Sequence, residues 1–386
     1  MKIYLTKTAI LQGVQTVQRA VPLKSPMLNL QSILLTAQDN HITFAATDME
    51  IGIRCFQKAE IEEEGTILLP AKLLFEIIRR LPDDIIECES NGRNFILRYG
   101  DADFTLNGYD PEEYPEIGGF VATTTMTLPG QILKKIIQQV QFACKIDEES
   151  GDVFSGILME TQDETLTLAA TDTHRLAVNT GTFSTTERGQ MGGKVVDLIS
   201  KTKQSWIIPN KSMLELSRLL KNDDEVTIEG HRESARLNFK FNDIELITRL
   251  INGQYPNYKQ VIPTAAGGAK ILFDRVILLE AVERAGLLSR DAYLKTSVVR
   301  FQIEEGQIVI NQAAEMGKIF ERIPVEFTGT GMTISFNLRY IIDALKNIET
   351  EKISLELSSP YAPCVFRPVE SEDDETYINL ILPLRH

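Results

Sequence analysis

The sequence predicts an α+β fold of three repeated domains, each with two amphipathic helices backed by antiparallel sheets. A segment of strand, helix, acidic turn and strand occurs three times, beginning at Thr66, Trp206 and Thr333. A second pattern, residues 42–48, returns at 166–172, and a looser copy spans 308–314. The first two copies are 124 residues apart, close to one third of the 386-residue chain. A repeat of that length indicates one domain used three times.

The first domain is predicted over residues 1–122. Residues 1–7 alternate apolar and polar side chains, which indicates a strand with one solvated face. Residues 8–20 have helical apolar spacing, and so do residues 71–81, where apolar side chains recur four residues apart. Pro70 is expected in the first turn of this second helix, where proline is tolerated. Residues 82–84 form an acidic turn that leads into a strand at 85–90.

The second and third domains, predicted over 128–264 and 270–386, repeat this order. Helices are expected at 129–143 and 210–221, and again at 274–288 and 338–347. Pro209 is expected in the first turn of the helix near 210–221, and Asn337 is a good N-cap for the last helix. The seams fall near 121–128 and 264–270, where Gly267, Gly268 and other small residues indicate a linker.

The composition is that of an ordinary globular protein, with 43% hydrophobic and 24% charged residues. No apolar run approaches the roughly 18 residues of a membrane span. We therefore expect a cytoplasmic protein with no membrane partner. The four cysteines are far apart, which favours reduced core thiols over disulfides. The four histidines form no metal-binding pair, and neither a metal nor a cofactor is expected.

Basic charge is concentrated on the predicted helices, although the net charge of the chain is −14. The solvent faces of the six helices sum to +8, which leaves −22 on the strands and loops. Ordinary solvated helix faces would explain this bias. If the six helices point the same way, however, they form one basic surface that attracts phosphates. Sequence-independent contact with a duplex backbone is then the interpretation that fits.

Three motifs resemble the bacterial DNA polymerase III beta subunit family, the sliding clamps. Residues 170–177, ATDTHRLA, resemble the signature of the central domain, and residues 255–263, YPNYKQVIP, look like a second signature. The ending, residues 382–386, is also similar. The resemblance covers the whole chain. It implies the DNA-clamp fold, in which two subunits join head to tail as a homodimeric ring around duplex DNA.

The sequence departs from the family pattern at a few positions. Thr173 stands where the family usually has glycine, and Gln260 where it often has a basic residue. Leu382 and Leu384 stand where methionines are common, and Lys24 where an arginine is frequent. These differences bear on affinity and leave the family resemblance intact.

The resemblance also implies a pocket that binds a short, extended partner peptide. Its apolar side chains and few polar groups suit such a motif. The alternative is that these residues are simply core. The implied residues are Phe154, Thr171, His174, Arg175, Leu176, Pro256, Val261, Asn337, Tyr340, Leu380, Leu382, Pro383, Leu384 and Arg385.

Two further surfaces follow from the charge pattern and the resemblance. The expected DNA-facing residues are Lys24, Lys72, Arg79, Arg80, Lys134, Lys135, Lys211, Arg218, Lys221, Arg339 and Lys346. The implied dimer interface joins Phe104 and Leu106, on an edge strand, to Leu287 and Leu288 of the partner. An exposed edge strand needs a partner strand or a covering element. Taken alone, these four side chains would be assigned to the core.

The predicted function is a processivity factor that tethers the replicative polymerase to DNA and is not an enzyme. The resemblance implies the polymerase catalytic subunit, a clamp loader and other clamp-motif proteins as partners. A clamp-like scaffold that is never loaded on DNA is the alternative. No catalytic residues are assigned, because His174 lacks an orienting acid and Asp172 is placed to cap the turn. Three acidic pairs, at 83–84, 223–224 and 373–374, are interpreted as solvated turns or loop.

Overall fold

The structure is a computed structural model of the whole chain. It describes residues 1–118, 122–146, 151–162, 165–182, 190–191, 194–195, 203–231, 235–263, 268–288, 298–314, 317–369 and 377–385. The contacts divide the chain into two compact units. Unit 1 comprises residues 1–131, 187–200 and 218–250, and unit 2 comprises 132–186, 201–217 and 251–386. The prediction for the acidic pair at 373–374 lies outside the described residues.

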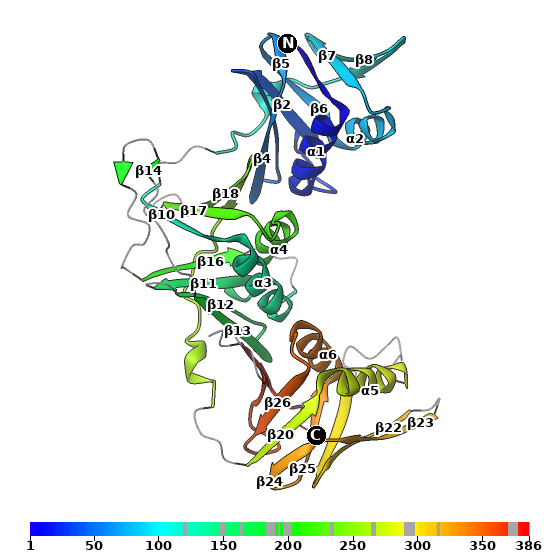
Figure 1. The fold of residues 1–386 in the computed structure, drawn as a ribbon, viewed down its shortest axis with the longest axis vertical. Coiled ribbons are helices and arrows are strands. Elements are labelled where there is room, and N and C mark those ends of the chain that lie inside the picture. Colours follow the sequence, from blue (N-terminus) through cyan, green and yellow to red (C-terminus); the bar gives the residue numbers. More distant parts are fainter. Residues whose placement is uncertain are drawn as a thin grey trace. The chain divides into compact units, whose positions relative to one another are not determined.

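Unit 1 contains two antiparallel sheets (Figure 1). The first has the strand order β5-β1-β7-β8-β9, with β5 Glu60–Glu63, β1 Lys2–Thr6, β7 Ile85–Asn91, β8 Asn94–Tyr99 and β9 Ala102–Asn107. The second has the order β10-β17-β18-β19-β4-β3-β2-β6, with β10 Thr124–Pro129, β17 Glu225–His231, β18 Arg236–Phe241, β19 Ile244–Arg249, β4 Ile51–Lys58, β3 His41–Thr47, β2 Ser32–Gln38 and β6 Gly65–Pro70. A short pair, β14 Gln190–Met191 with β15 Lys194–Val195, also belongs to unit 1.

Helices α1 (Lys7–Val17) and α2 (Ala71–Arg80) lie side by side over these sheets (Figure 1). Thr6 caps α1 by accepting a hydrogen bond from the backbone N–H of Ala9. Gly13 of α1 lies against the ring of Phe44, and this close approach leaves no room for a side chain. The apolar face of each helix is therefore buried on the sheets, while the charged face is left to solvent.

Unit 2 also contains two sheets. The larger has the order β16-β11-β12-β13-β28-β27-β26-β20-β24, with β16 Gln204–Pro209, β11 Gly156–Gln162, β12 Thr165–Thr171, β13 Arg175–Thr182, β28 Ile378–Ile381, β27 Cys364–Pro368, β26 Lys352–Leu357, β20 Ala269–Asp274 and β24 Glu326–Gly329. The smaller has the order β23-β22-β21-β25, with β23 Gly317–Pro324, β22 Gln307–Ala314, β21 Val298–Glu304 and β25 Met332–Asn337.

Four more helices complete the fold in the described ranges: α3 Gly130–Val140, α4 Asn210–Leu219, α5 Arg275–Leu288 and α6 Leu338–Asn347. In unit 2, α5 packs beside α6. Asn337 caps α6 by accepting from the N–H of Arg339 at 3.0 Å, as predicted. The positions of two prolines differ slightly from the prediction. Pro70 and Pro209 end the preceding strands, so each lies just before the first helical turn and not within it.

The prediction of repeated helices backed by antiparallel sheets is confirmed. Each predicted helix has a counterpart whose ends differ by at most a few residues. Two of them, at 8–20 and 129–143, finish with a 3-10 turn, Gln18–Ala20 and Gln141–Ala143. The domain boundaries at 122, 128, 264 and 270 stay predictions, because the contacts group the chain differently.

The four cysteines are buried and unpaired, as the prediction of core thiols requires. One prediction about the acidic turns is wrong. Asp224 is only 6% exposed, because its carboxylate accepts from the N–H of Lys221 at 2.7 Å and from the side-chain amide of Asn242 at 2.6 Å. Asp224 therefore fixes the turn after α4. In the described part of the chain, no helix is long and apolar enough to span a membrane.

Candidate functional site

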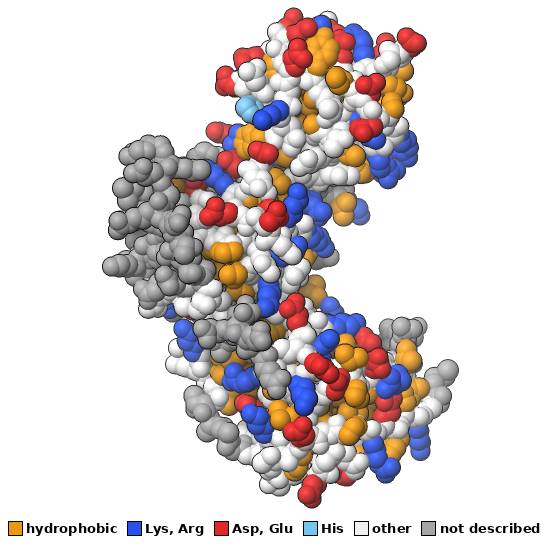
Figure 2. Space-filling view, viewed as in Figure 1, with side chains coloured by type: hydrophobic (Ala, Val, Ile, Leu, Met, Phe, Trp, Pro, Cys, Tyr) orange, Lys and Arg blue, Asp and Glu red, His pale blue; other side chains and the backbone are white. Residues whose placement is uncertain are grey.

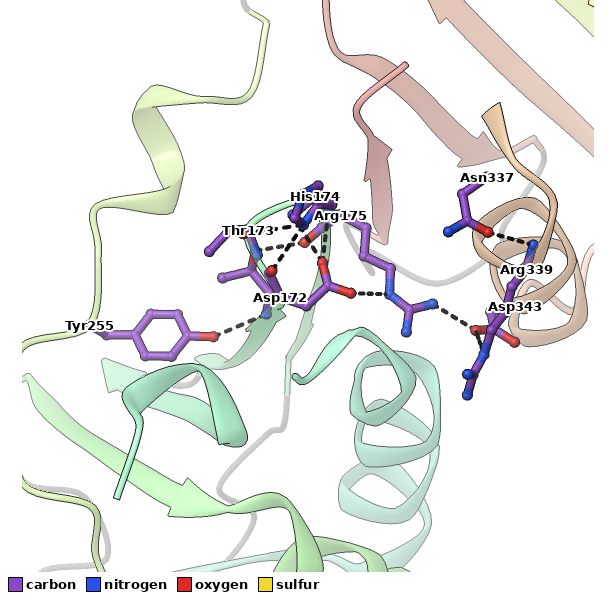
Figure 3. A network of polar contacts seen from close by, with 9 residues as sticks. Asp172, Thr173, His174, Arg175, Tyr255, Asn337, Arg339 and Asp343 are labelled. Atoms are coloured by element: carbon purple, nitrogen blue, oxygen red, sulfur yellow. Dashed lines mark hydrogen bonds and ion pairs between the residues drawn. The ribbon is translucent and has the colours of Figure 1, made fainter. Parts of the chain in front are cut away.

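The turn between β12 and β13 is held by short hydrogen bonds from its own residues (Figure 3). The carboxylate of Asp172 accepts from the backbone N–H of His174 and of Arg175, both at 3.0 Å. Thr171 Oγ1 donates to the carbonyl of Arg175 at 2.6 Å and accepts from the N–H of Thr173 at 3.1 Å. Asp172 therefore caps the turn, as the sequence indicated.

Thr173 occupies the left-handed region of backbone space, with φ of 77°. A β-branched residue is strained there, whereas glycine is not. Thr173 therefore carries backbone strain that the glycine usual in the family would avoid, because the turn requires the left-handed conformation at this position.

Arg175 is the centre of the network, and its side chain is only 5% exposed. Its guanidinium donates to Asp172 at 2.9 Å and to Asp343 of α6 at 2.6 Å. It also stacks over the ring of Tyr340, 4.5 Å from the centroid, and over Phe142 at 5.3 Å. Two carboxylates and two rings satisfy this buried charge, so Arg175 ties β13 to α6.

Tyr255 supports the same turn from beneath. Its hydroxyl accepts from the backbone N–H of Thr171 at 3.1 Å, and its ring lies 6.5 Å from that of Phe154. Burial raises the pKa of the Tyr255 phenol, so the hydroxyl stays neutral in the folded protein.

The C-terminal segment after β28 is fixed at two points. The N–H of Leu382 donates to the carbonyl of His174 at 2.9 Å, and the N–H of Leu384 donates to the carbonyl of Ser335 at 2.8 Å. Pro383 lies between them and restricts the backbone further. The segment is thus held in place beside the turn.

We call this region the Asp172 surface. It comprises residues 172–174, 256–261 and 382–385, together with Phe154 and the start of α6. Exposed side chains on it include His174, Pro256, Val261 and Leu382. Thr171, Arg175, Leu176 and Leu380 are buried beneath it, and the last two belong to a hydrophobic cluster. Of the predicted pocket residues in the turn, Thr171, His174, Arg175 and Leu176, only His174 is exposed. Phe154, Asn337 and Tyr340 are half-buried.

The predicted DNA-facing residues are mostly at the surface of the helices that carry them. Lys72, Arg79 and Arg80 are exposed on α2, where Figure 2 shows basic side chains gathered. Glu76 forms ion pairs with both arginines, at 3.0 Å for Arg79. The remaining ones are exposed or half-buried: Lys24, Lys134, Lys135, Lys211, Arg218, Lys221, Arg339 and Lys346. Glu215 of α4 is buried and does not lie on the solvent face of that helix.

The predicted interface residues differ in exposure. β9 is an edge strand, and Phe104 on it is 38% exposed. Leu106 is only 2% exposed within its own chain, so most of its side chain already packs in the core. Leu287, at the end of α5, is 59% exposed, and Leu288 is half-buried.

Sequence reasoning missed two parts of this site. Asp343 and Phe142 were not predicted, because their contacts with Arg175 span 168 and 33 residues and leave no local signal. The role of Tyr255 had a signal that was overlooked. The pair Tyr255-Pro256 repeats Tyr114-Pro115, and Tyr114 makes the same hydrogen bond to Thr47 in unit 1. Among the described residues, no three potential metal-ligating side chains cluster.

Comparison with known proteins gives a consistent result along the chain. The N-terminal, central and C-terminal domain families of the DNA polymerase III beta subunit match residues 1–118, 127–257 and 259–385. The beta sliding clamp of Streptococcus pneumoniae (strain TIGR4) is 32% identical over 394 residues, covering 99% of this chain and 98% of that protein.

Solved structures agree. The DNA polymerase sliding clamp from Bacillus subtilis is 29% identical and superimposes with a TM-score of 0.90, covering 100% of this chain and 99% of that one. A Pseudomonas aeruginosa sliding clamp bound to griselimycin is 25% identical, with a TM-score of 0.88 and full coverage of both chains.

Proposed function

This chain belongs to the bacterial DNA polymerase III beta subunit family, the beta sliding clamps, and on that premise we propose how it works. Two copies form a ring around duplex DNA and tether the replicative polymerase catalytic subunit, without catalysing a reaction themselves. The observation that carries the proposal is the ordered match of three clamp domains over a fold built from one repeated unit.

Direct contact with DNA uses the basic helix faces. A few lysines and arginines that neutralise phosphates give weak binding that falls steeply with salt, because counterions are released. Tethering by a closed ring is topological, so it depends far less on salt. The two kinds of attachment can therefore be separated by ionic strength.

Loading onto nicked circular DNA, followed by linearisation, tests the proposal. The protein should stay on circles at raised salt and leave linear DNA by sliding off the ends. Equal loss from circles and linear molecules would support the scaffold alternative instead. As a test of the helix faces, Arg79→Glu with Arg80→Glu should weaken direct binding, whereas Lys58→Glu, on a strand, should leave it nearly unchanged.

The dimer contact is proposed to join β9 of one chain to the end of α5 of its partner. Phe104 and Leu287 supply exposed apolar surface, and burial of such side chains stabilises by about 1.5–3 kcal/mol each. Because Leu106 is already buried, Phe104 carries this side of the contact. Leu287→Ala with Leu288→Ala should give monomers in sedimentation at micromolar concentration. A dimer of unchanged stability would remove the assignment.

The Asp172 surface is proposed to bind the short linear motifs of partners, which include the polymerase and the clamp loader. His174, Pro256, Val261 and Leu382 offer an apolar face with one imidazole. The fixed C-terminal segment is partly preorganised, so binding orders little additional chain.

A further inference from the structure

Unit 1 contains a hollow beside the turn between β3 and β4. Its cavity volume is about 60 Å³, and it opens to solvent. That space holds a single side-chain head and is too small for a whole peptide. The residues on which the argument rests are Met49, Gly52, Ile117, Arg236, Ile247 and Arg249.

The floor of the hollow is made by the pairing of β4 with β19. Gly52 lies directly opposite Ile247 in this pair, and Ile117 packs over Gly52. A side chain at position 52 would clash with Ile117, whose Cγ2 would lie 2.7 Å from an added Cβ. The glycine therefore allows the loop at 115–118 to close one side of the hollow.

Two arginines form the opposite side. Arg236 on β18 and Arg249 on β19 are direct cross-strand partners. Like charges at such positions repel each other and destabilise the sheet. In the part of the chain that the structure describes, no carboxylate forms an ion pair with either guanidinium. An anion between the two would relieve the repulsion and accept charge-assisted hydrogen bonds.

The backbone around the hollow repeats that of the Asp172 surface. The carboxylate of Asp48 accepts from the N–H of Glu50 at 3.0 Å and of Ile51 at 2.8 Å. The hydroxyl of Tyr114 accepts from the N–H of Thr47 at 3.0 Å. The N–H of Arg249 donates to the carbonyl of Glu50 at 3.0 Å, where Leu382 donates to His174 in unit 2. Arg249 therefore stands at the position that the C-terminal segment fills in the other unit.

We propose that this hollow is a second peptide site, which takes the carboxylate of an acidic side chain from an extended partner segment. The carboxylate lies between Arg236 and Arg249, and the apolar residue beside it contacts Met49 and Ile117. Glu50 and Glu116, exposed at the rim, disfavour a second acid next to the first. The site thus selects an isolated acidic residue between apolar neighbours.

Methionine methyl NMR on the full-length dimer provides the test, because Met49 is 49% exposed at the hollow. The probe is the peptide acetyl-Ala-Leu-Asp-Leu-Ala-amide, with Asn in place of Asp as the matched control. The Asp peptide should shift the Met49 methyl signal in a saturable way and bind roughly tenfold more tightly than the Asn peptide, as charge-assisted hydrogen bonds require. The His174 ring signal reports the Asp172 surface separately.

Two variants complete the experiment. Arg236→Gln with Arg249→Gln should abolish the preference for Asp, while the His174 signal stays unchanged and shows that the chain is folded. Arg236→Glu with Arg249→Glu should reverse the preference, so that a peptide with Lys in place of Asp binds more tightly.

Several results would overturn the proposal. These are a Met49 signal that does not respond, equal affinity for the Asp and Asn peptides, and an unchanged preference in the glutamine variant. A stronger response of Met49 to inorganic phosphate or to a DNA duplex than to the peptide would assign the hollow to phosphate instead.

Discussion

The Asp48 turn of unit 1, between β3 and β4, and the Asp172 turn of unit 2, between β12 and β13, have the same backbone hydrogen bonds. They differ in most of the side chains that take no part in those hydrogen bonds. In both turns, a threonine hydroxyl, a capping carboxylate and a tyrosine hydroxyl hold the same groups. Even the strained residue repeats, with φ of 79° at Met49 and 77° at Thr173. The threonine and aspartate contacts of the turn are local, whereas the tyrosine lies 67 residues from its partner in unit 1 and 84 residues in unit 2.

The side chains beside the threonine, aspartate and tyrosine that hold each turn differ between the two units. Arg175, paired with two carboxylates, corresponds to Ile51, which is fully buried in unit 1. Leu176 corresponds to Gly52, and Leu382 corresponds to Arg249. One unit therefore presents an apolar surface with a fixed tail, and the other presents a small hollow with two arginines. The same turn therefore supports two different surfaces.

The largest effect on stability is expected from the ion pairs of Arg175, which have no counterpart in unit 1. Arg175→Ala removes the cation that Asp172 and Asp343 share and leaves Asp343 with its 3.7 Å ion pair to Arg339. Breaking such a buried pair costs about 3 kcal/mol. Denaturant unfolding of the variant should show this loss, and adding Asp343→Asn should recover part of it. A loss below about 1 kcal/mol would mean that the network contributes little stability.

Removal of the C-terminal residues 382–386 should weaken peptide binding at the Asp172 surface, whereas a change in the hollow of unit 1 should not. Deletion of residues 382–386 removes two apolar contacts, and the affinity for a labelled peptide from the polymerase tail should fall at least tenfold. Arg249→Ala, at the matching position of unit 1, should leave this affinity unchanged. Titration by fluorescence anisotropy measures both variants. Equal affinity of the truncated and intact proteins would place the partner site elsewhere.

The two tyrosines should respond alike to high pH. Burial raises the pKa of Tyr114 to about 12 and raises that of Tyr255 as well. The neutral phenol is favoured in the folded state, so this stability is present below pH 10, the ordinary pKa, and is lost as pH rises toward the folded value. For Tyr114 the loss at pH 11 is about 1.4 kcal/mol.

Tyr114→Phe removes the hydrogen bond from the N–H of Thr47, the hydrogen bond to the carbonyl of Ser32, and the titration of the phenol. It should lower the free energy of unfolding by about 1 kcal/mol at pH 8, and this deficit should close by pH 11. Urea unfolding at the two pH values measures the deficit, with Tyr255→Phe as the matched variant. A deficit that stays constant with pH would contradict the buried, neutral phenol.

The smallest effect concerns the strained residue. Thr173→Gly should raise the free energy of unfolding by about 0.5 kcal/mol, because relief of the left-handed strain exceeds the entropy cost of glycine. Met49→Gly should change stability by less, since methionine is not β-branched. A loss of more than about 1 kcal/mol in Thr173→Gly would show instead that the contact of Thr173 Oγ1 with His174 Nδ1, at 3.3 Å, stabilises the turn.

The sequence by itself determined the repeat, the helices and the capped turns, because each depends on residues a few positions apart. Periodic apolar side chains located α2 and α6 within a residue or two, and Asp172 was correctly assigned as a cap. The motifs at 170–177 and 255–263 also located the main components of the Asp172 surface.

Only the tertiary structure decided which of these side chains reach solvent. Arg175 is buried because Asp343, 168 residues away, meets it, and Leu106 and Asp224 are buried by neighbours that no local pattern indicates. Arg236 and Arg249 face each other only because of the register between β18 and β19. Burial and pairing depend on contacts between distant segments, and the apolar periodicity of one segment carries no information about them.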